Sequence, residues 1–222
     1  MSILNYAKQS SWPNGFGFQQ SPIDLRQATT TVDTDMTILT PWMTDQEIDD
    51  QVTIRLAGQG TTRINETTWT FVQAHFHVPA EHIVAEKTVA ELHFVHQSAI
   101  GALCVVAVLV PVGQANPIMA DVLDHFQPHV TQPINFDLTR LLPKQGTVYQ
   151  YLGSLPPPPL TEGVTWYVIE QTEITMSSNQ LARYQQFFEP NNRHVQAINR
   201  RPIFRGVFKQ LKRSAGDDPL HG

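Results

Sequence analysis

The feature that most restricts the fold is an unbroken apolar run at residues 103–112, which is rich in valine. A helix that crosses a bilayer needs about 20 such residues, so this run is too short to span a membrane. β-branched residues without polar alternation are typical of a strand covered on both faces. We therefore expect a central strand in a sheet with side chains packed against each side.

Several other segments have the composition of strands. Val52, Ile54 and Leu56 alternate with polar residues, as in a half-buried strand. Further strands are expected at residues 69–78, 89–96, 147–152 and 164–171. The chain has 222 residues and no repeat or long linker, so we expect one domain over residues 1–222, with a flexible polar tail from about 212.

Helix signals are few and peripheral. Asn116 and Pro117 are the residue types of an N-cap and a first helical position, and Ser177 with Gln180 has the spacing of a capping box. The prolines at 156–159 exclude helix and central strand and predict an extended loop. The expected fold class is therefore mainly β with short peripheral helices.

Charge and cysteine content limit which partners and which covalent cross-links we expect. The net charge is −5 and only 16% of residues are charged, so we expect neither nucleic acid nor a membrane as a partner. Cys104 is the sole cysteine, which excludes an internal disulfide. The first residues form no recognisable signal segment, so we expect a cytoplasmic protein. The sequence leaves the oligomeric state open, a homodimer included.

Histidines are placed for metal binding in two of the expected strands. Side chains alternate between faces along a strand, so Gln73, His75 and His77 share one face. On the following strand, Glu91 and His93 share a face in the same way. If the two strands pair, three imidazoles meet and leave one tetrahedral position open, which is the layout of a catalytic zinc site.

The neighbouring polar residues support this hypothesis. Gln73 and Glu91 are spaced to accept hydrogen bonds from the second ring nitrogens of histidine ligands, which fixes the ring orientation. An isolated His-x-His motif is more often structural than metal-binding, and the third histidine with its nearby carboxylate is what favours Zn²⁺. His82 and His96 are expected instead as hydrogen-bonded core residues.

Several blocks resemble the α-class carbonic anhydrase family and occur in the family's order. They are QSPIDL at 20–25, QAHFHVPAEH at 73–82, AELHFVH at 90–96, NFDLTRLLP at 135–143, GSLPPPPLTEGVTW at 153–166, and the set Asn192, Arg193, Gln196 and Arg201. The short form of the 73–82 block is typical of bacterial members. The resemblance implies a large, twisted, mostly antiparallel central sheet with Zn²⁺ at the base of a cleft, bound by His75, His77 and His93.

The resemblance also implies an activity, the reversible hydration of carbon dioxide to bicarbonate and a proton. Zinc lowers the pKa of bound water to about 7, which supplies a nucleophile at neutral pH. By position, Val95, Val105, Leu155 and Trp166 match the family's apolar wall for carbon dioxide. From the sequence alone, ordinary core packing is the simpler explanation of these four residues.

Two departures from the family pattern bear on the rate. Pro156 and Pro157 stand where the family has two threonines, the first of which orients the nucleophile and hydrogen-bonds a glutamate matched by Glu81. Proline offers neither a hydroxyl nor an N–H, so Glu81 is expected to lack this partner. We assign the position of the family's proton-carrying histidine to Gly60, and no histidine precedes His75.

Three functions remain open on the sequence. The first is a zinc carbonic anhydrase with slow turnover, in which Glu81 takes part in catalysis. The second is a carbonic anhydrase-like protein that binds zinc or anions without turnover, which Pro156 and Pro157 favour. The third is a zinc-dependent hydrolase of esters, for which the sequence names no substrate.

Overall fold

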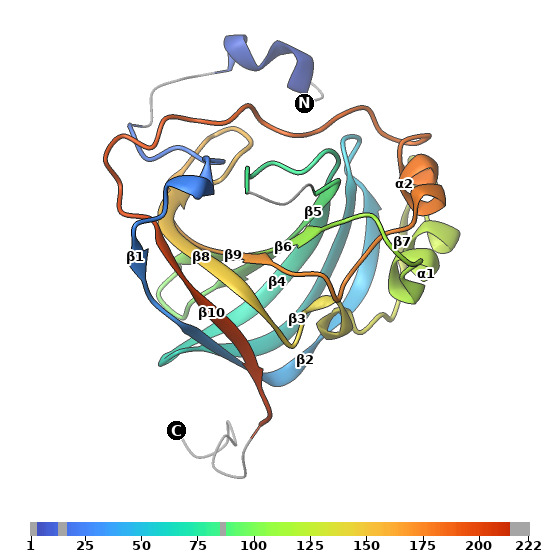
Figure 1. The fold of residues 1–222 in the computed structure, drawn as a ribbon. Helices are drawn as coiled ribbons and strands as arrows, with labels where there is room; N and C mark the ends of the chain where they lie inside the picture. The colour runs from blue at the N-terminus through green and yellow to red at the C-terminus, as the bar shows by residue number, and fades with distance from the viewer. Residues whose placement is uncertain (1–3, 13–16, 85–87, 214–222) are drawn as a thin grey trace.

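The described residues form a single twisted sheet that curls around the centre of the molecule (Figure 1). The computed structural model describes residues 4–12, 17–84 and 88–213. Its strands are β1 (Thr30–Thr31), β2 (Thr34–Asp49), β3 (Ile54–Ile64), β4 (Thr67–His77), β5 (Ala90–Gln97), β6 (Leu103–Val110), β7 (Thr131–Pro133), β8 (Gln145–Ser154), β9 (Glu162–Glu170) and β10 (Phe204–Leu211). The mainly β, single-domain prediction is confirmed.

Most neighbouring strands run antiparallel, as the family resemblance implies. The order across the sheet is β1-β10-β8-β9-β6-β5-β4-β3-β2-β7, and β10 pairs additionally with β2. The parallel pairs among the described strands are β1–β10, β10–β2 and β6–β9. Since β10 contacts both β8 and β2, the two ends of the sheet meet, and the sheet encloses a core instead of lying flat.

The apolar run at 103–112 forms the central strand β6, which ends at Val110. Val106 and Val108 pack into the larger apolar cluster on one face of the sheet. Val105 and Ala107 pack into a smaller cluster on the other face. The prediction of a strand buried on both faces is confirmed, and the smaller cluster lies on the face that carries the histidines.

Two short helices lie together at one edge of the molecule (Figure 1). They are α1 (Pro117–His125) and α2 (Ser178–Tyr184), and both contribute to the larger apolar cluster. The Asn116 side chain accepts hydrogen bonds from backbone N–H groups of α1, and the Ser177–Gln180 capping box is present. Both helix starts are therefore confirmed. The 3₁₀ helices are η1 (Tyr6–Ser11), η2 (Leu25–Gln27) and η3 (Leu138–Leu141).

Two expectations about irregular segments need adjustment. The prolines at 156–159 form a tight loop between β8 and β9, closed by hydrogen bonds from Leu155 N–H to Thr161 O and from Leu160 N–H to Pro157 O. The predicted extended conformation is therefore wrong. Of the expected tail, residues 212 and 213 are exposed and outside any strand, and the rest lies outside the described residues. No described helix has the length and apolarity that a membrane crossing requires.

Candidate metal centre

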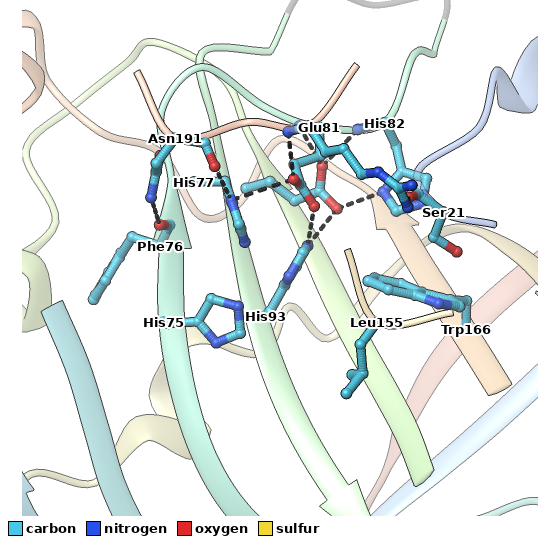
Figure 2. Close-up of polar contacts among 12 residues, drawn as sticks. Ser21, His75, Phe76, His77, Glu81, His82, His93, Leu155, Trp166 and Asn191 are labelled. Atoms are coloured by element: carbon cyan, nitrogen blue, oxygen red, sulfur yellow. Dashed lines mark hydrogen bonds and ion pairs between the residues drawn. The ribbon is translucent and has the colours of Figure 1, made fainter. Parts of the chain in front are cut away.

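Three imidazoles converge on one point at the cavity face of the sheet (Figure 2). Antiparallel pairing sets His75 of β4 directly opposite His93 of β5, and His77 opposite Glu91. One ring nitrogen from each of the three histidines lies within 4.8 Å of the others. Such a spacing allows a single ion with nitrogen ligands at about 2.0–2.1 Å to contact all three rings, so the triad is able to hold zinc.

Polar neighbours fix two of the rings. The Nδ1 of His75 lies 3.0 Å from the Oε1 of Gln73. The Nε2 of His93 lies 2.9 Å from the Oε1 of Glu91. These contacts match the spacing argument from the sequence, and they leave His75 Nε2 and His93 Nδ1 free to face a metal.

The third ring is held by a residue that the sequence analysis missed. The Nδ1 of His77 lies 2.7 Å from the backbone oxygen of Asn191. The Nε2 of His77 is buried and has no hydrogen-bond partner among the described residues. A buried ring nitrogen is normally partnered, so this atom fits a missing metal ligand bond. Because the acceptor is a backbone carbonyl, the identity of residue 191 carried no signal for it.

The environment keeps the three imidazoles neutral, which is the form that binds metal. Burial, and then the neighbouring His77 and His93, hold the pKa of His75 well below its usual value. Burial is also the main cause that lowers the pKa of His77, to about 3. For His93, burial lowers the pKa although Glu91 opposes this shift. At neutral pH the triad therefore offers three nitrogen lone pairs.

Glu91 anchors the site to the loop that follows β4. Its Oε2 accepts hydrogen bonds from the backbone N–H groups of Glu81 and His82, both at 2.9 Å. Its Oε1 lies 2.6 Å from His82 Nδ1. Burial raises the pKa of Glu91, but His82 and His93 outweigh it and hold the pKa well below its usual value. Glu91 is thus an ionised carboxylate, and His82 is the hydrogen-bonded core residue expected from the sequence.

Glu81 has one satisfied oxygen and one unsatisfied oxygen. Its Oε1 accepts a hydrogen bond of 2.8 Å from the backbone N–H of Arg193. Its Oε2 is buried without a hydrogen-bond partner among the described residues. Burial, followed by the nearby charge of Glu91, raises the pKa of Glu81 well above its usual value. The free oxygen agrees with the absence of a threonine hydroxyl at Pro156.

The expected apolar wall is assembled across three strands. Val95, Val105 and Trp166 are in register on β5, β6 and β9. The ring centroid of Trp166 lies 5.0 Å from that of His93, and Leu155 packs against the same cluster. The structure therefore brings all four residues to the face that carries the triad.

A cavity of about 380 Å³ opens beside the triad. His75, His77 and Gln73 line it together with Pro157, whereas Pro156 is buried and is not among the lining residues. Charged and aromatic side chains that the sequence analysis did not single out also line it, namely Tyr6, Asp50 and Arg55.

The assignment of Gly60 to the cavity is wrong. Gly60 pairs with Phe71 in the middle of β3, and a side chain there would collide with Pro41 and Trp42. The strand shifts register between residues 57 and 60, which moves the later residues relative to the triad. The cavity is instead lined by Val52 and neighbouring residues at the start of β3.

Comparison with known proteins agrees with this geometry. A family model of eukaryotic-type carbonic anhydrases matches residues 7–207. The chain belongs to the α-carbonic anhydrase family. The carbonic anhydrase of Pectobacterium carotovorum is 32% identical over 195 residues, which cover 84% of this chain and 80% of that protein.

Solved α-carbonic anhydrases share the fold. The Photobacterium profundum enzyme matches with a TM-score of 0.78 and 29% identity, over 85% of this chain and 89% of that one. The Thermovibrio ammonificans enzyme, solved in complex with the inhibitor sulfanilamide, matches with a TM-score of 0.75 and 29% identity, over 84% and 86% of the two chains. This chain therefore belongs to the α-carbonic anhydrase family, has a complete histidine triad, and carries prolines at positions 156 and 157.

Proposed function

We propose that the chain binds one Zn²⁺ through His75, His77 and His93 and catalyses the reversible hydration of carbon dioxide to bicarbonate and a proton. The observation that carries this proposal is the convergence of three neutral imidazoles, each with its other nitrogen already engaged. Membership of the α-carbonic anhydrase family supports the choice of substrate.

The chain's own residues prepare the site in two ways. Gln73, Glu91 and the Asn191 carbonyl orient the rings before any metal binds, which reduces the cost of assembling the site. The apolar side chains of Val95, Val105 and Trp166 are almost fully buried on the face that carries the triad, so a small uncharged substrate at the metal would meet apolar surroundings there. A zinc ion held there supplies a nucleophile at neutral pH by lowering the pKa of bound water to about 7.

The site favours slow turnover. Glu81 Oε2 has no hydrogen-bond partner within the part of the chain that the structure describes, and Pro156 offers no hydroxyl or N–H to position the nucleophile. Removing one oriented donor from a catalytic centre costs roughly 10²–10³ in rate. This observation also supports the second candidate function, a protein that binds zinc and anions with little or no turnover.

The deciding experiment follows carbon dioxide hydration by stopped flow with zinc-loaded protein. We expect acceleration above buffer that disappears on chelation and in His75→Ala. His194→Ala is the matched control, because the side chain at that position is exposed and does not line the cavity beside the triad. One equivalent of bound zinc without acceleration would favour the binding function instead.

A further inference from the structure

Residues 4–12 at the N-terminus form a strap beside the cavity of the metal centre. Figure 1 shows the 3₁₀ helix of this strap, η1, next to the long segment that leads from α2 to β10. None of the six described residues of η1 is buried. Leu4 and Tyr6 line both the cavity beside the triad and another cavity of about 830 Å³. Apolar packing therefore contributes little to holding the strap, and its polar contacts matter more.

One side chain of the strap, that of Gln9, binds two backbone groups of the segment before β10. Its Nε2 donates a hydrogen bond of 2.9 Å to the backbone oxygen of Asn192. Its Oε1 accepts a hydrogen bond of 2.8 Å from the backbone N–H of His194. The carboxamide thus takes the place that a neighbouring strand would occupy in a sheet. Gln9 clamps the segment on either side of Arg193.

The opposite edge of the same segment contacts the candidate metal centre. Backbone groups alternate in direction along an extended chain, so those of Asn191 and Arg193 face away from the strap. The Asn191 oxygen lies 2.7 Å from the Nδ1 of His77. The Arg193 N–H donates a hydrogen bond of 2.8 Å to the Oε1 of Glu81. The segment therefore connects the strap to two groups of the site.

These two connections are anchored differently. The side chain of Asn191 donates to the Phe76 oxygen at 2.7 Å and accepts from the Val78 N–H at 2.8 Å, which fixes this residue to the end of β4. The guanidinium of Arg193 donates to residues 20 and 21, but the long side chain between them leaves the backbone N–H able to move. The strap therefore acts on the Arg193 N–H more than on the Asn191 carbonyl.

We propose that Gln9 is a positioning residue, which acts through the Arg193 N–H to fix the carboxylate of Glu81. This carboxylate lies beside two rings of the triad, with Oε1 3.5 Å from His77 Nδ1 and Oε2 4.0 Å from His93 Nε2. Without the Arg193 N–H, neither oxygen of the buried Glu81 would have a hydrogen-bond partner within the described part of the chain. The relevance to catalysis rests on the proposed function, whereas the clamp itself rests on the contacts of Gln9.

Hydrogen exchange of the zinc-loaded protein, followed by NMR, tests this proposal. In Gln9→Ala the Arg193 N–H should exchange roughly 10-fold faster or more, as expected when a segment that opens locally loses two hydrogen bonds. The Nδ1–H of His77 should keep its exchange rate, because Asn191 is anchored separately. Gln9→Glu keeps the acceptor for the His194 N–H and loses the donor, so its Arg193 N–H should exchange at an intermediate rate.

The matched control is Gln186→Ala, which makes the same change at an exposed position that lines neither cavity. Its Arg193 N–H should exchange as in the unmodified protein. Zinc content and melting temperature of every variant are measured alongside. Faster exchange confined to residues 192–194 supports the clamp. Equal acceleration in the central strand β6 would overturn it, because Gln9 would then stabilise the whole fold.

An unchanged Arg193 exchange rate in Gln9→Ala would also overturn the proposal, since other contacts would then hold the segment. Failure of the proposed function is distinguishable from this result. A protein that hydrates no carbon dioxide but shows the faster Arg193 exchange in Gln9→Ala retains the clamp. An active protein in which that variant leaves the exchange rate unchanged lacks it.

Discussion

Strand β5 carries two buried histidines on its opposite faces, and their surroundings differ. His93 faces the cavity, with its Nε2 beside Glu91 and its Nδ1 directed toward the other two imidazoles. His96 faces the larger apolar cluster, where it packs edge-on against the rings of Trp42 and Phe71. Its Nδ1 lies 2.9 Å from the Phe94 backbone oxygen, and its Nε2 has no hydrogen-bond partner among the described residues.

Comparing His93 with His96 separates the effect of burial on the imidazole pKa from the effect of neighbouring polar groups on metal binding. Burial lowers the pKa of both imidazoles, that of His96 to about 4. A neutral imidazole is therefore not sufficient to mark a metal ligand. The distinguishing features of His93 are a carboxylate that fixes its tautomer and two further ring nitrogens within reach.

The largest expected effect is on zinc affinity, and it tests the difference between His93 and His96 directly. His93→Ala should lower zinc affinity by more than the roughly 10–100-fold typical of losing a residue that only orients a ligand. His96→Phe keeps an aromatic ring in the core and should retain one zinc per chain with unchanged affinity. Competition titration against a chromophoric chelator measures both. Equal losses in the two variants would remove the distinction between the faces.

The next effect concerns the rate. Pro156→Thr supplies the hydroxyl and the N–H that the family has at this position, and carbon dioxide hydration should rise roughly 10²–10³-fold. Pro156→Ala restores only the N–H and should give a smaller gain, which separates the two contributions. Unchanged stopped-flow rates in both variants would show that another residue limits the rate.

A smaller effect on metal binding is expected from the residue that orients His93. Glu91→Gln removes the ionised acceptor, and zinc affinity should fall roughly 10–100-fold. Glu47→Gln is the matched control, because Glu47 is also buried and also contacts a histidine, His125, but away from the triad. Chelator competition that gives the same zinc affinity for Glu91→Gln as for the unmodified protein would show that β5 geometry alone positions His93.

The smallest expected effect is on the free energy of unfolding and comes from His96, which faces the larger apolar cluster. The unfolded chain protonates His96 near its usual pKa of 6.5, whereas the folded protein does so only near pH 4. Between these values the unfolded state binds more protons, so stability falls as the pH falls. At pH 5 this amounts to roughly 2 kcal/mol. Urea unfolding of metal-free His96→Phe should lose that part of the pH dependence, while exposed His194→Phe should keep it.

Much of the fold follows from local patterns, and the exceptions have physical causes. β6 is a continuous apolar run, and β4 and β5 keep a period of two around the histidines. The bounds of all three were predicted to within about two residues. β2 was not predicted, because register shifts near Thr40 and Thr44 break the period of two along its length. β10 was missed because half of its side chains are exposed and only Phe208 is buried.

The candidate site likewise contains residues that the sequence identified and residues that it did not. His75, His77 and His93, with Gln73 and Glu91, were identified because a strand fixes which side chains share a face. The contacts of Asn191 with His77 and of Arg193 with Glu81 are made by backbone atoms brought from more than a hundred residues away, so the side-chain pattern did not indicate these contacts. Arg55 lies opposite His75 because of the register in which β3 pairs with β4, and the sequence does not reveal this register. Gly60 was misplaced for the same reason.

The proposed function requires that His75 and His77 of β4 and His93 of β5 bind a single Zn²⁺. Diffraction data from crystals of zinc-loaded protein, collected on both sides of the zinc absorption edge, test it most directly. We predict one anomalous peak per chain at about 2.0–2.1 Å from His75 Nε2, His77 Nε2 and His93 Nδ1. A peak at other residues, or no peak after zinc has been supplied, would contradict it.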